Sequence, residues 1–381
     1  MHVIPIASGK GGVGKSLLAA NIAIALGQAG KRVILVDLDL GASNLHLILG
    51  ISNLTRGVGT LLSRPGSDFD EIVIETEYEN LRFVPGDAEI PGLANLTTAQ
   101  KRMLIRRLVA LDADYLILDL GAGTNFNILD FFLTSGHGII VTAPTPTATV
   151  NAYLFLKNIV FRVMSTAFKR KSEASRYLSQ IRTDGSGLQR VYVMQLLDQI
   201  SRIDPESHRA YVEAIARFQP RLVLNMVEDP KDAEKAVRLR RSCLQYLGVD
   251  VDHLGVIYRD EIQDIALQAR LPVVVYKPNA LLSQAVYRIA DKLIQLGGVE
   301  EPFPLEQSEI DESYESAEME AEIDFASRMD YVEDLLHTGA LTHGDLVETV
   351  KMQQLEINQL RRESQLLKSK LLKAAAQGYR L

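Results

Sequence analysis

Cysteine is nearly absent from this 381-residue sequence, in which Cys243 is the single thiol. One thiol excludes an intrachain disulfide framework, and it excludes an iron–sulfur or zinc cage that takes two or more thiolates from one subunit. A chain without disulfides is typical of a reducing compartment. Because Cys243 lies in the helical pattern VRLRRSCLQYL, we expect it to be a structural residue.

Long apolar runs are also absent. No run of eighteen apolar residues occurs, and the start, MHVIPIASG, has neither a basic region nor the apolar stretch of a signal peptide. These absences argue against a spanning helix and a secretory signal, so we expect a cytoplasmic protein. The 7 histidines are scattered without the spacing of metal ligands.

Charge is distributed unevenly along the chain. Residues 1–299 carry 33 Lys and Arg against 30 Asp and Glu, whereas residues 300–334 carry 14 acids and one base, Arg328. A segment with Pro302, Pro304 and dense like charge buries little apolar surface, so residues 300–334 are predicted to be an acidic linker. An acidic docking surface is the alternative.

Short apolar, β-branched runs alternate with longer helical patterns over residues 1–299. Because runs such as VILV and YLIL show no polar alternation, both of their faces should be buried, as in a parallel sheet covered by helices. This predicts a doubly wound α/β domain with helices on both faces of a mostly parallel sheet. The expected strands are 3–7, 33–36, 115–118, 138–142, 222–225, 254–257 and 273–276, and the expected helices are 16–29, 98–111, 232–247, 261–269 and 280–296.

The interval between the expected strands at 138–142 and 222–225 is longer than one crossover helix needs. Its helical patterns predict a helical insertion at about residues 160–218 on one edge of the sheet. The insertion contains a group of basic residues, namely Lys169, Arg170, Lys171, Arg176, Arg182 and Arg190. These residues form either a solvated surface or a nucleic-acid or partner surface.

The strongest motif is SGKGGVGKS at residues 8–16, which satisfies G-x-x-x-x-G-K-[ST] between an expected strand and an expected helix. Glycines allow successive backbone N–H groups to converge on phosphate oxygens, and the helix N-terminus adds its positive end. In this pattern Lys15 neutralises the β- and γ-phosphates of a nucleotide and Ser16 binds Mg²⁺. The expected cofactors are therefore ATP and Mg²⁺, and Gly9, Gly11, Gly12, Val13, Gly14 and Leu17 complete the nucleotide cradle together with Lys10, Lys15 and Ser16.

Carboxylates follow two of the expected strands beside this loop. Asp37 and Asp39 lie in VDLDLGASN, and Asp119 lies in LILDLGAG. Ligands of open α/β sheets bind at the carboxyl ends of the strands, and hard oxygen ligands suit Mg²⁺. Asp119 is therefore the first candidate for supporting a bound Mg²⁺.

The second lysine of the loop, Lys10, gives the sequence KGGVGKS, which resembles the MinD/ParA family of deviant Walker A ATPases. VDLDLGASN and LILDLGAG are similar to the two switch segments of that family. The resemblance implies that Lys10 reaches the nucleotide of a partner subunit, that Asp39 orients the attacking water with help from Asn44, and that Asp37 lies near the metal. It also implies an adenine pocket at Asn225, in LVLNMV, and Asp260, in GVIYRDEI.

The resemblance implies a slow, partner-stimulated ATPase that dimerises with ATP. DLGAG after the second switch resembles the FlhG/FleN branch of flagellar-number regulators, so the expected role is spatial or numerical control of a cellular assembly. The alternatives are a ParA-like partition ATPase that binds nonspecific DNA and a MinD-like regulator of the division site. An activating protein partner and a location at the inner face of the membrane or at a pole belong to the same expectation.

The C-terminal residues 335–381 are predicted to form a helix. Positions 346, 350, 353, 357, 360, 364, 367, 371 and 374 alternate spacings of four and three, and apolar side chains occupy all of them except Gln353 and Ser364. This heptad pattern indicates a short coiled coil or a partner helix. A membrane-surface helix and a solvated helix are the alternatives, since LLKSKLLK carries three lysines.

Overall fold

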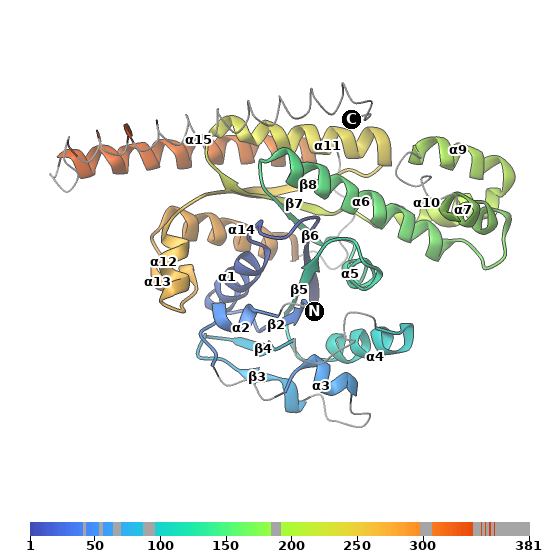
Figure 1. Cartoon of the computed structure of the whole chain (residues 1–381), viewed down its shortest axis with the longest axis horizontal. Coiled ribbons are helices and arrows are strands. Elements are labelled where there is room, and N and C mark those ends of the chain that lie inside the picture. The colour runs from blue at the N-terminus through green and yellow to red at the C-terminus, as the bar shows by residue number, and fades with distance from the viewer. Residues whose placement is uncertain are drawn as a thin grey trace, which may run out of the picture. The chain divides into compact units, whose positions relative to one another are not determined.

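Eight strands form one sheet in the order β3-β4-β2-β5-β1-β6-β7-β8 in the computed structural model (Figure 1). All paired strands are parallel except β3 and β4. The central strand β1 pairs with β5 on one side and with β6 on the other. The strand order therefore changes direction at β1, which is the topological switch point of the sheet. The strands are β1 (His2–Ser8), β2 (Val33–Leu38), β3 (Ile74–Glu75), β4 (Leu81–Val84), β5 (Tyr115–Ala122), β6 (Ile139–Thr142), β7 (Arg221–Val227) and β8 (Asp252–Tyr258).

The structure describes residues 1–40, 43–52, 56–63, 70–86, 96–183, 192–297 and 307–337, together with residues 344, 347, 350, 351 and 354. The chain divides into two units, Met1–Ile323 and Asp324–Leu381. In the part of the second unit that is described, the final helix of the first unit continues to His337. The predicted coiled coil over residues 346–374 lies almost entirely outside the described residues.

Helices cover both faces of the sheet, as predicted. On one face α1 (Lys15–Gln28) packs against α14 (Leu281–Gly297), and on the other α5 (Phe126–Phe132) packs against α6 (Pro146–Ala167) (Figure 1). The remaining helices of the layers are α2 (Leu45–Ile48), α3 (Val58–Ser63), α4 (Thr98–Val109), α11 (Glu234–Leu247), α12 (Ile262–Gln268) and α13 (Val273–Tyr276). None of the described helices is long and apolar enough to cross a membrane.

Six of the seven runs predicted as strands are strands. The prediction was wrong for residues 273–276, which form the short helix α13 behind Pro272. The sheet ends at β8, so the run has no strand to pair with, and its valines instead fill the core beneath α1 and α14. Asn21 Oδ1 accepts a hydrogen bond of 3.1 Å from the Val274 N–H, which fixes this packing.

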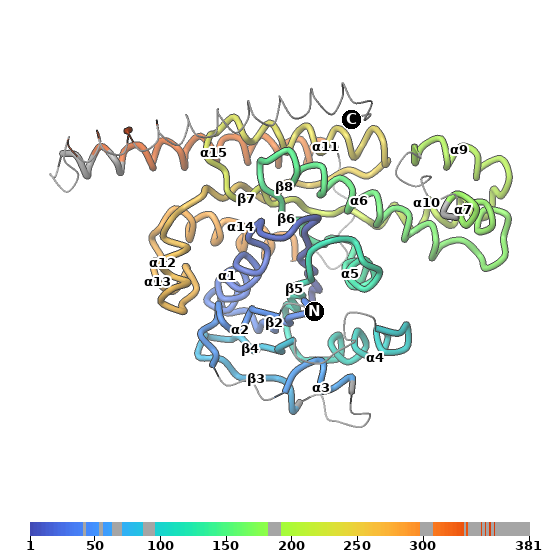
Figure 2. Tube along the Cα trace, viewed as in Figure 1, coloured from blue at the N-terminus to red at the C-terminus, as the bar shows by residue number. Residues whose placement is uncertain are grey.

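The predicted insertion is helical. After α6 the chain forms α7 (Glu173–Thr183), α9 (Val193–Ile203) and α10 (Pro205–Ile215), which Figure 2 shows in green at one end of the first unit. Helix α9 buries Val193, Leu196, Leu197 and Ile200, an i, i+3, i+4, i+7 face. In the basic group Lys169 forms an ion pair with Glu206, so this lysine is already neutralised within the insertion.

The acidic segment departs from its prediction as a linker, because residues 307–337 form helix α15 (Gln307–His337). Within the first unit, Ile310, Tyr314, Ala317 and Ala321 are buried at spacings of four, three and four residues. These positions form one helical face, while the acids occupy the others. The high content of acidic residues led to the linker prediction, but these four apolar side chains bury enough surface for the helix to pack against the domain.

Helix α15 covers the edge strand β8. Tyr314 Oη donates a hydrogen bond of 3.0 Å to the Val251 carbonyl, and Tyr258 Oη donates one of 2.8 Å to the Ala321 carbonyl. Lys292 Nζ lies 2.7 Å from Glu320 Oε1, so one of the acids pairs with a base of α14. The helix thus protects the backbone edge of the sheet from pairing with another strand.

Candidate functional site

The loop at residues 9–14 connects the carboxyl end of β1 to the first turn of α1. Gly12 and Gly14 have φ angles of 79° and 83°, which glycine adopts without strain. A Cβ on Gly9 would lie 2.1 Å from the carbonyl oxygen of Asn151, so glycine is also required where the loop touches α6. No side chain caps the N-terminus of α1, which leaves its first N–H groups available to an anion.

Lys15, Ser16 and Asp119 form a buried polar cluster behind this loop. Lys15 Nζ lies 2.5 Å from Asp119 Oδ1 and donates to Ser16 Oγ at 3.1 Å. Burial raises the pKa of Asp119, while the Lys15 cation and hydrogen bonds from Lys15 and Ser16 oppose that rise. The structure thus brings together the lysine and the hydroxyl of the motif and the carboxylate predicted from its place at the end of a strand.

Asp37 lies beside this cluster at the end of β2, where it pairs in register with Asp119 of β5. Its carboxylate accepts hydrogen bonds from Ser43 Oγ at 2.6 Å and from the Asp39 N–H at 3.0 Å. Burial, and then the charge of Asp119, raises the pKa of Asp37 to about 6. The contacts hold the loop after β2 against the sheet, and the sequence pattern gave no indication of Ser43 in this role.

The raised pKa of Asp37 predicts a pH-dependent effect on stability. Because its pKa rises from 3.8 to about 6, the folded state holds this proton more tightly than the unfolded state does. The free energy of unfolding of the wild type, relative to Asp37→Asn, should therefore fall by about 2 kcal/mol between pH 4 and pH 7. Urea unfolding of both proteins across that range measures the difference, and a difference independent of pH would contradict the assignment.

Asp39 and Asn44 follow Asp37 at the same edge of the sheet. A Cβ on Gly121 would lie 3.0 Å from Asp39 Oδ1, so the Asp39 carboxylate lies against the backbone of β5 just beyond Asp119. Its charge also contributes to the raised pKa of Asp119. Asn44 is exposed at the N-terminus of α2. Both predicted water-orienting residues therefore lie on the segment after β2, and the Asp39 carboxylate is near the Lys15 cluster.

Lys10 is exposed on the loop, and its Nζ donates a hydrogen bond of 3.2 Å to Thr147 Oγ1 in the first turn of α6. Its hydrogen bond is thus to α6, outside the cluster of Lys15, Ser16 and Asp119. An exposed ammonium held by one neutral hydroxyl moves at little cost. No pattern in the sequence identified Thr147 as its partner.

Asn225 and Asp260, predicted at an adenine pocket, occupy different surroundings. Asn225 Nδ2 donates a hydrogen bond of 2.8 Å to the Val13 carbonyl, and it would lie 2.3 Å from a Cβ on Gly14. Asn225 therefore supports the glycine-rich loop directly. Asp260 Oδ1 instead accepts a hydrogen bond of 3.0 Å from the Ile262 N–H at the start of α12. Their contact with a base stays a prediction.

The donors beside the loop suit a magnesium–nucleotide complex. Among the described residues, no group of three or more His, Cys, Asp or Glu side chains could hold a metal ion alone. The Ser16 hydroxyl and the Asp119 carboxylate supply oxygen, and Mg²⁺ takes few protein ligands, keeps several waters and binds substrate phosphates. The residues therefore fit Mg²⁺ held mainly by a nucleotide, with Asp37 in the adjacent strand position.

Comparison with known proteins identifies relatives for this arrangement. The family model for the CobQ/CobB/MinD/ParA nucleotide binding domain matches residues 4–273. The flagellum site-determining protein YlxH of Helicobacter pylori is 35% identical over 156 residues, which are 40% of this chain and 52% of that protein. The antiactivator FleN of Pseudomonas aeruginosa is 26% identical over 247 residues, 61% of this chain and 87% of that protein. The chain thus spans about half the length of the first of these relatives.

Solved structures match the fold at lower identity. The septum site-determining protein MinD of Pyrococcus horikoshii, complexed with Mg-ADP, has a TM-score of 0.53 at 20% identity and covers 78% of this chain and 97% of its own. A ParA family ATPase from Chlorobium tepidum has a TM-score of 0.52 at 19% identity, covering 76% and 98%. These matches confirm the predicted doubly wound architecture.

Proposed function

Since this chain belongs to the CobQ/CobB/MinD/ParA nucleotide-binding family, we propose that it binds and hydrolyses ATP, and that it acts through an ATP-dependent homodimer. One observation carries the proposal. The buried Lys15–Asp119 pair lies directly behind a glycine loop whose helix N-terminus is uncapped, so a cation, open N–H groups and a carboxylate converge on one point. Triphosphate recognition requires these three elements together.

Lys15 has two roles in the proposed mechanism. Without nucleotide it neutralises Asp119 at 2.5 Å, and with ATP it turns its charge toward the β- and γ-phosphates. Mg²⁺, held by Ser16 and supported by Asp119, would neutralise phosphate charge during the transfer. Asp39, beside Gly121, orients the attacking water from the segment after β2, and Asn44 assists it.

Lys10 supplies the contact between subunits. Its ammonium leaves Thr147 and reaches the phosphates of the partner's nucleotide, where a second cation stabilises the charge that develops in the transition state. Hydrolysis removes the γ-phosphate that both subunits hold, so the dimer separates. Nucleotide state thereby controls which surfaces are available to other proteins.

We propose that this cycle of ATP binding and hydrolysis regulates a flagellar assembly. The relatives YlxH and FleN carry names that refer to flagellum site determination and to antiactivation. We infer a regulator of flagellum placement or number, with an activating protein partner. It acts at the inner face of the membrane or at a pole.

The proposal is tested by phosphate release from the full chain with ATP and Mg²⁺. Asp39→Ala should lower the rate at least about 100-fold, the usual scale for losing a residue that handles the attacking nucleophile, and leave ATP affinity within about threefold. Asp291→Ala, which changes an exposed acid of α14, is the matched control and should keep the wild-type rate. Equal phosphate release from wild type and Asp39→Ala would indicate a nucleotide-binding scaffold without turnover.

A further inference from the structure

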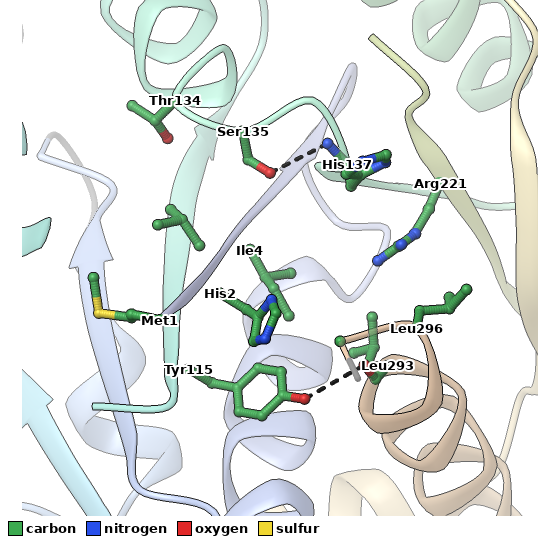
Figure 3. Close-up of a pocket in the computed structure, with 12 residues that line it drawn as sticks. Met1, His2, Ile4, Tyr115, Thr134, Ser135, His137, Arg221, Leu293 and Leu296 are labelled. Carbon is green, nitrogen blue, oxygen red and sulfur yellow. Dashed lines mark hydrogen bonds between the residues drawn. The ribbon is translucent and has the colours of Figure 1, made fainter. Parts of the chain in front are cut away.

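A cavity, here called the second cavity to keep it apart from the nucleotide site, lies at the end of the sheet opposite the glycine-rich loop. It has a volume of about 260 Å³, is open to solvent on one side, and is lined by the first residues of β1, β5 and β7 and the last turn of α14 (Figure 3). Strand β1 has its first residue, His2, at this cavity and its last residue, Ser8, at the loop. The seven-residue strand spans roughly 20 Å from His2 to Ser8, so the cavity is not part of the nucleotide site.

Arg221 is the central polar group of this cavity. It opens β7, is only 8% exposed, and projects its guanidinium toward the cavity (Figure 3). Its ion-pair partner Asp252 places Oδ2 3.8 Å from Arg221 Nε, which is too long for a hydrogen bond. Among the described residues, the guanidinium makes no direct hydrogen bond. Asp252 compensates the charge but leaves the N–H donors of the guanidinium available, so an anion in the cavity could accept hydrogen bonds from them.

Other polar groups lie near Arg221. His137 lies next to it and donates from Nδ1 to the Gln219 carbonyl at 3.3 Å, and Ser135 lies beside His137, from whose backbone N–H it accepts a hydrogen bond of 3.2 Å (Figure 3). His2 and Tyr115 form a tilted ring pair with centroids 5.3 Å apart. Tyr115 Oη donates to the Leu293 carbonyl at 3.5 Å, so the side-chain groups left to donate to a ligand are the Arg221 guanidinium and the Ser135 hydroxyl. No carboxylate is among the lining residues.

Apolar side chains lie among the polar groups of the cavity (Figure 3). Ile4, Leu293 and Leu296 line it, and the chain approaches closely where α14 ends, because a Cβ on Gly297 would lie 2.7 Å from Tyr115 Oη. An occupant would therefore contact both charged and apolar side chains. At about 30 Å³ for each water-sized group, the volume admits roughly nine non-hydrogen atoms.

We propose that this cavity binds a small organic anion, a carboxylate or a phosphate monoester, with its oxyanion on Arg221 and its apolar part against Ile4, Leu293 and Leu296. The guanidinium fork matches either oxyanion in a bidentate geometry. The cavity is spatially separate from the nucleotide site, since no residue of the loop or of the Lys15 cluster lines it.

Calorimetric titration of the full chain with butyrate, propyl phosphate and 1-butanol, all of which fit the volume, tests the proposal. Saturating Mg-ADP is present throughout so that propyl phosphate does not bind at the glycine-rich loop. We expect saturable binding of at least one anion, and binding of the neutral alcohol at least tenfold weaker. The tighter of the two anions distinguishes a carboxylate ligand from a phosphate ligand. No saturable binding of either anion, or equal binding of the alcohol, would overturn the proposal.

Variants of Arg221 locate the binding. Arg221→Met should lower the affinity for the anion at least tenfold. The double variant Arg221→Met/Asp252→Asn should do the same, and it avoids leaving the Asp252 carboxylate buried without its partner. Arg217→Met, which changes an exposed arginine four residues earlier, is the matched control and should bind as the wild type does. Should the Arg221 variants fail to fold, Leu296→Phe narrows the cavity from a half-buried position and is expected to abolish binding. Undiminished binding in the folded Arg221 or Leu296 variants would refute the assignment.

Discussion

Lys15→Ala is expected to abolish measurable ATP hydrolysis and to destabilise the fold at the same time. Turnover should fall at least about 100-fold, because the variant lacks the cation that faces the β- and γ-phosphates. The free energy of unfolding without nucleotide should fall by about 3 kcal/mol, because Asp119, 1% exposed, loses its partner at 2.5 Å. Phosphate release and urea unfolding measure the two effects separately.

The double variant Lys15→Ala/Asp119→Asn separates the fold from the chemistry. Replacing the carboxylate with an amide removes the unpaired buried charge, so most of the lost stability should return. Hydrolysis should stay absent, because neither the cation nor the carboxylate is restored. A double variant that hydrolyses ATP at the wild-type rate would show that the chemistry lies elsewhere in the chain.

Lys10→Ala should leave each subunit able to bind nucleotide and remove its ability to dimerise with ATP. The Lys10 side chain is exposed and donates a hydrogen bond of 3.2 Å to Thr147, so neither the fold nor the loop depends on it. We expect ADP affinity within about threefold of wild type, and a dimer fraction at least tenfold lower with ATP on a sizing column. The loss follows from removing the cation that bridges the subunits.

Two controls isolate the role of Lys10. Lys277→Ala removes another exposed lysine, far along the chain in the residue after α13, and should dimerise normally. Thr147→Ala removes the neighbour that holds Lys10 within its own subunit, so it should also retain the dimer. A Lys10→Ala protein whose elution with ATP matches wild type would exclude this lysine from the interface.

The sheet was predictable from the sequence wherever a strand is buried on both faces. VILV and YLIL are continuous apolar runs because neighbours cover them from two sides, and both are strands. The same reasoning failed at residues 273–276, where valines fill the core without a pairing partner. Strand β3 has two residues, which is too short for a pattern to be distinguished, and Arg82 interrupts the apolar run of β4.

Helix α15 illustrates the limit of composition as a predictor. The 14 acids of residues 300–334 suggested a linker, yet only every third or fourth position needs to be apolar for a helix to pack. Ile310, Tyr314 and Ala317 meet that requirement on their own. A test of helical periodicity within the acidic segment would have indicated the docked helix.

The candidate site was predictable where chemistry depends on consecutive residues. The loop, Lys15 and Ser16 follow from one local motif, and Asp119 follows from its place at the end of a strand. The contacts of Asp37 with Ser43 and of Lys10 with Thr147 depend on how the segments meet in space. Arg221 and His2 are 219 residues apart, so the second cavity was beyond any local pattern.

The central claim is that two copies of this chain associate when each holds ATP. Multi-angle light scattering of the wild-type chain with saturating Mg²⁺ and a non-hydrolysable ATP analogue tests it most directly. The account predicts a mass near twice the 42.2 kDa of one chain with the analogue, and the mass of one chain with ADP. A mass of one chain under both conditions would contradict it.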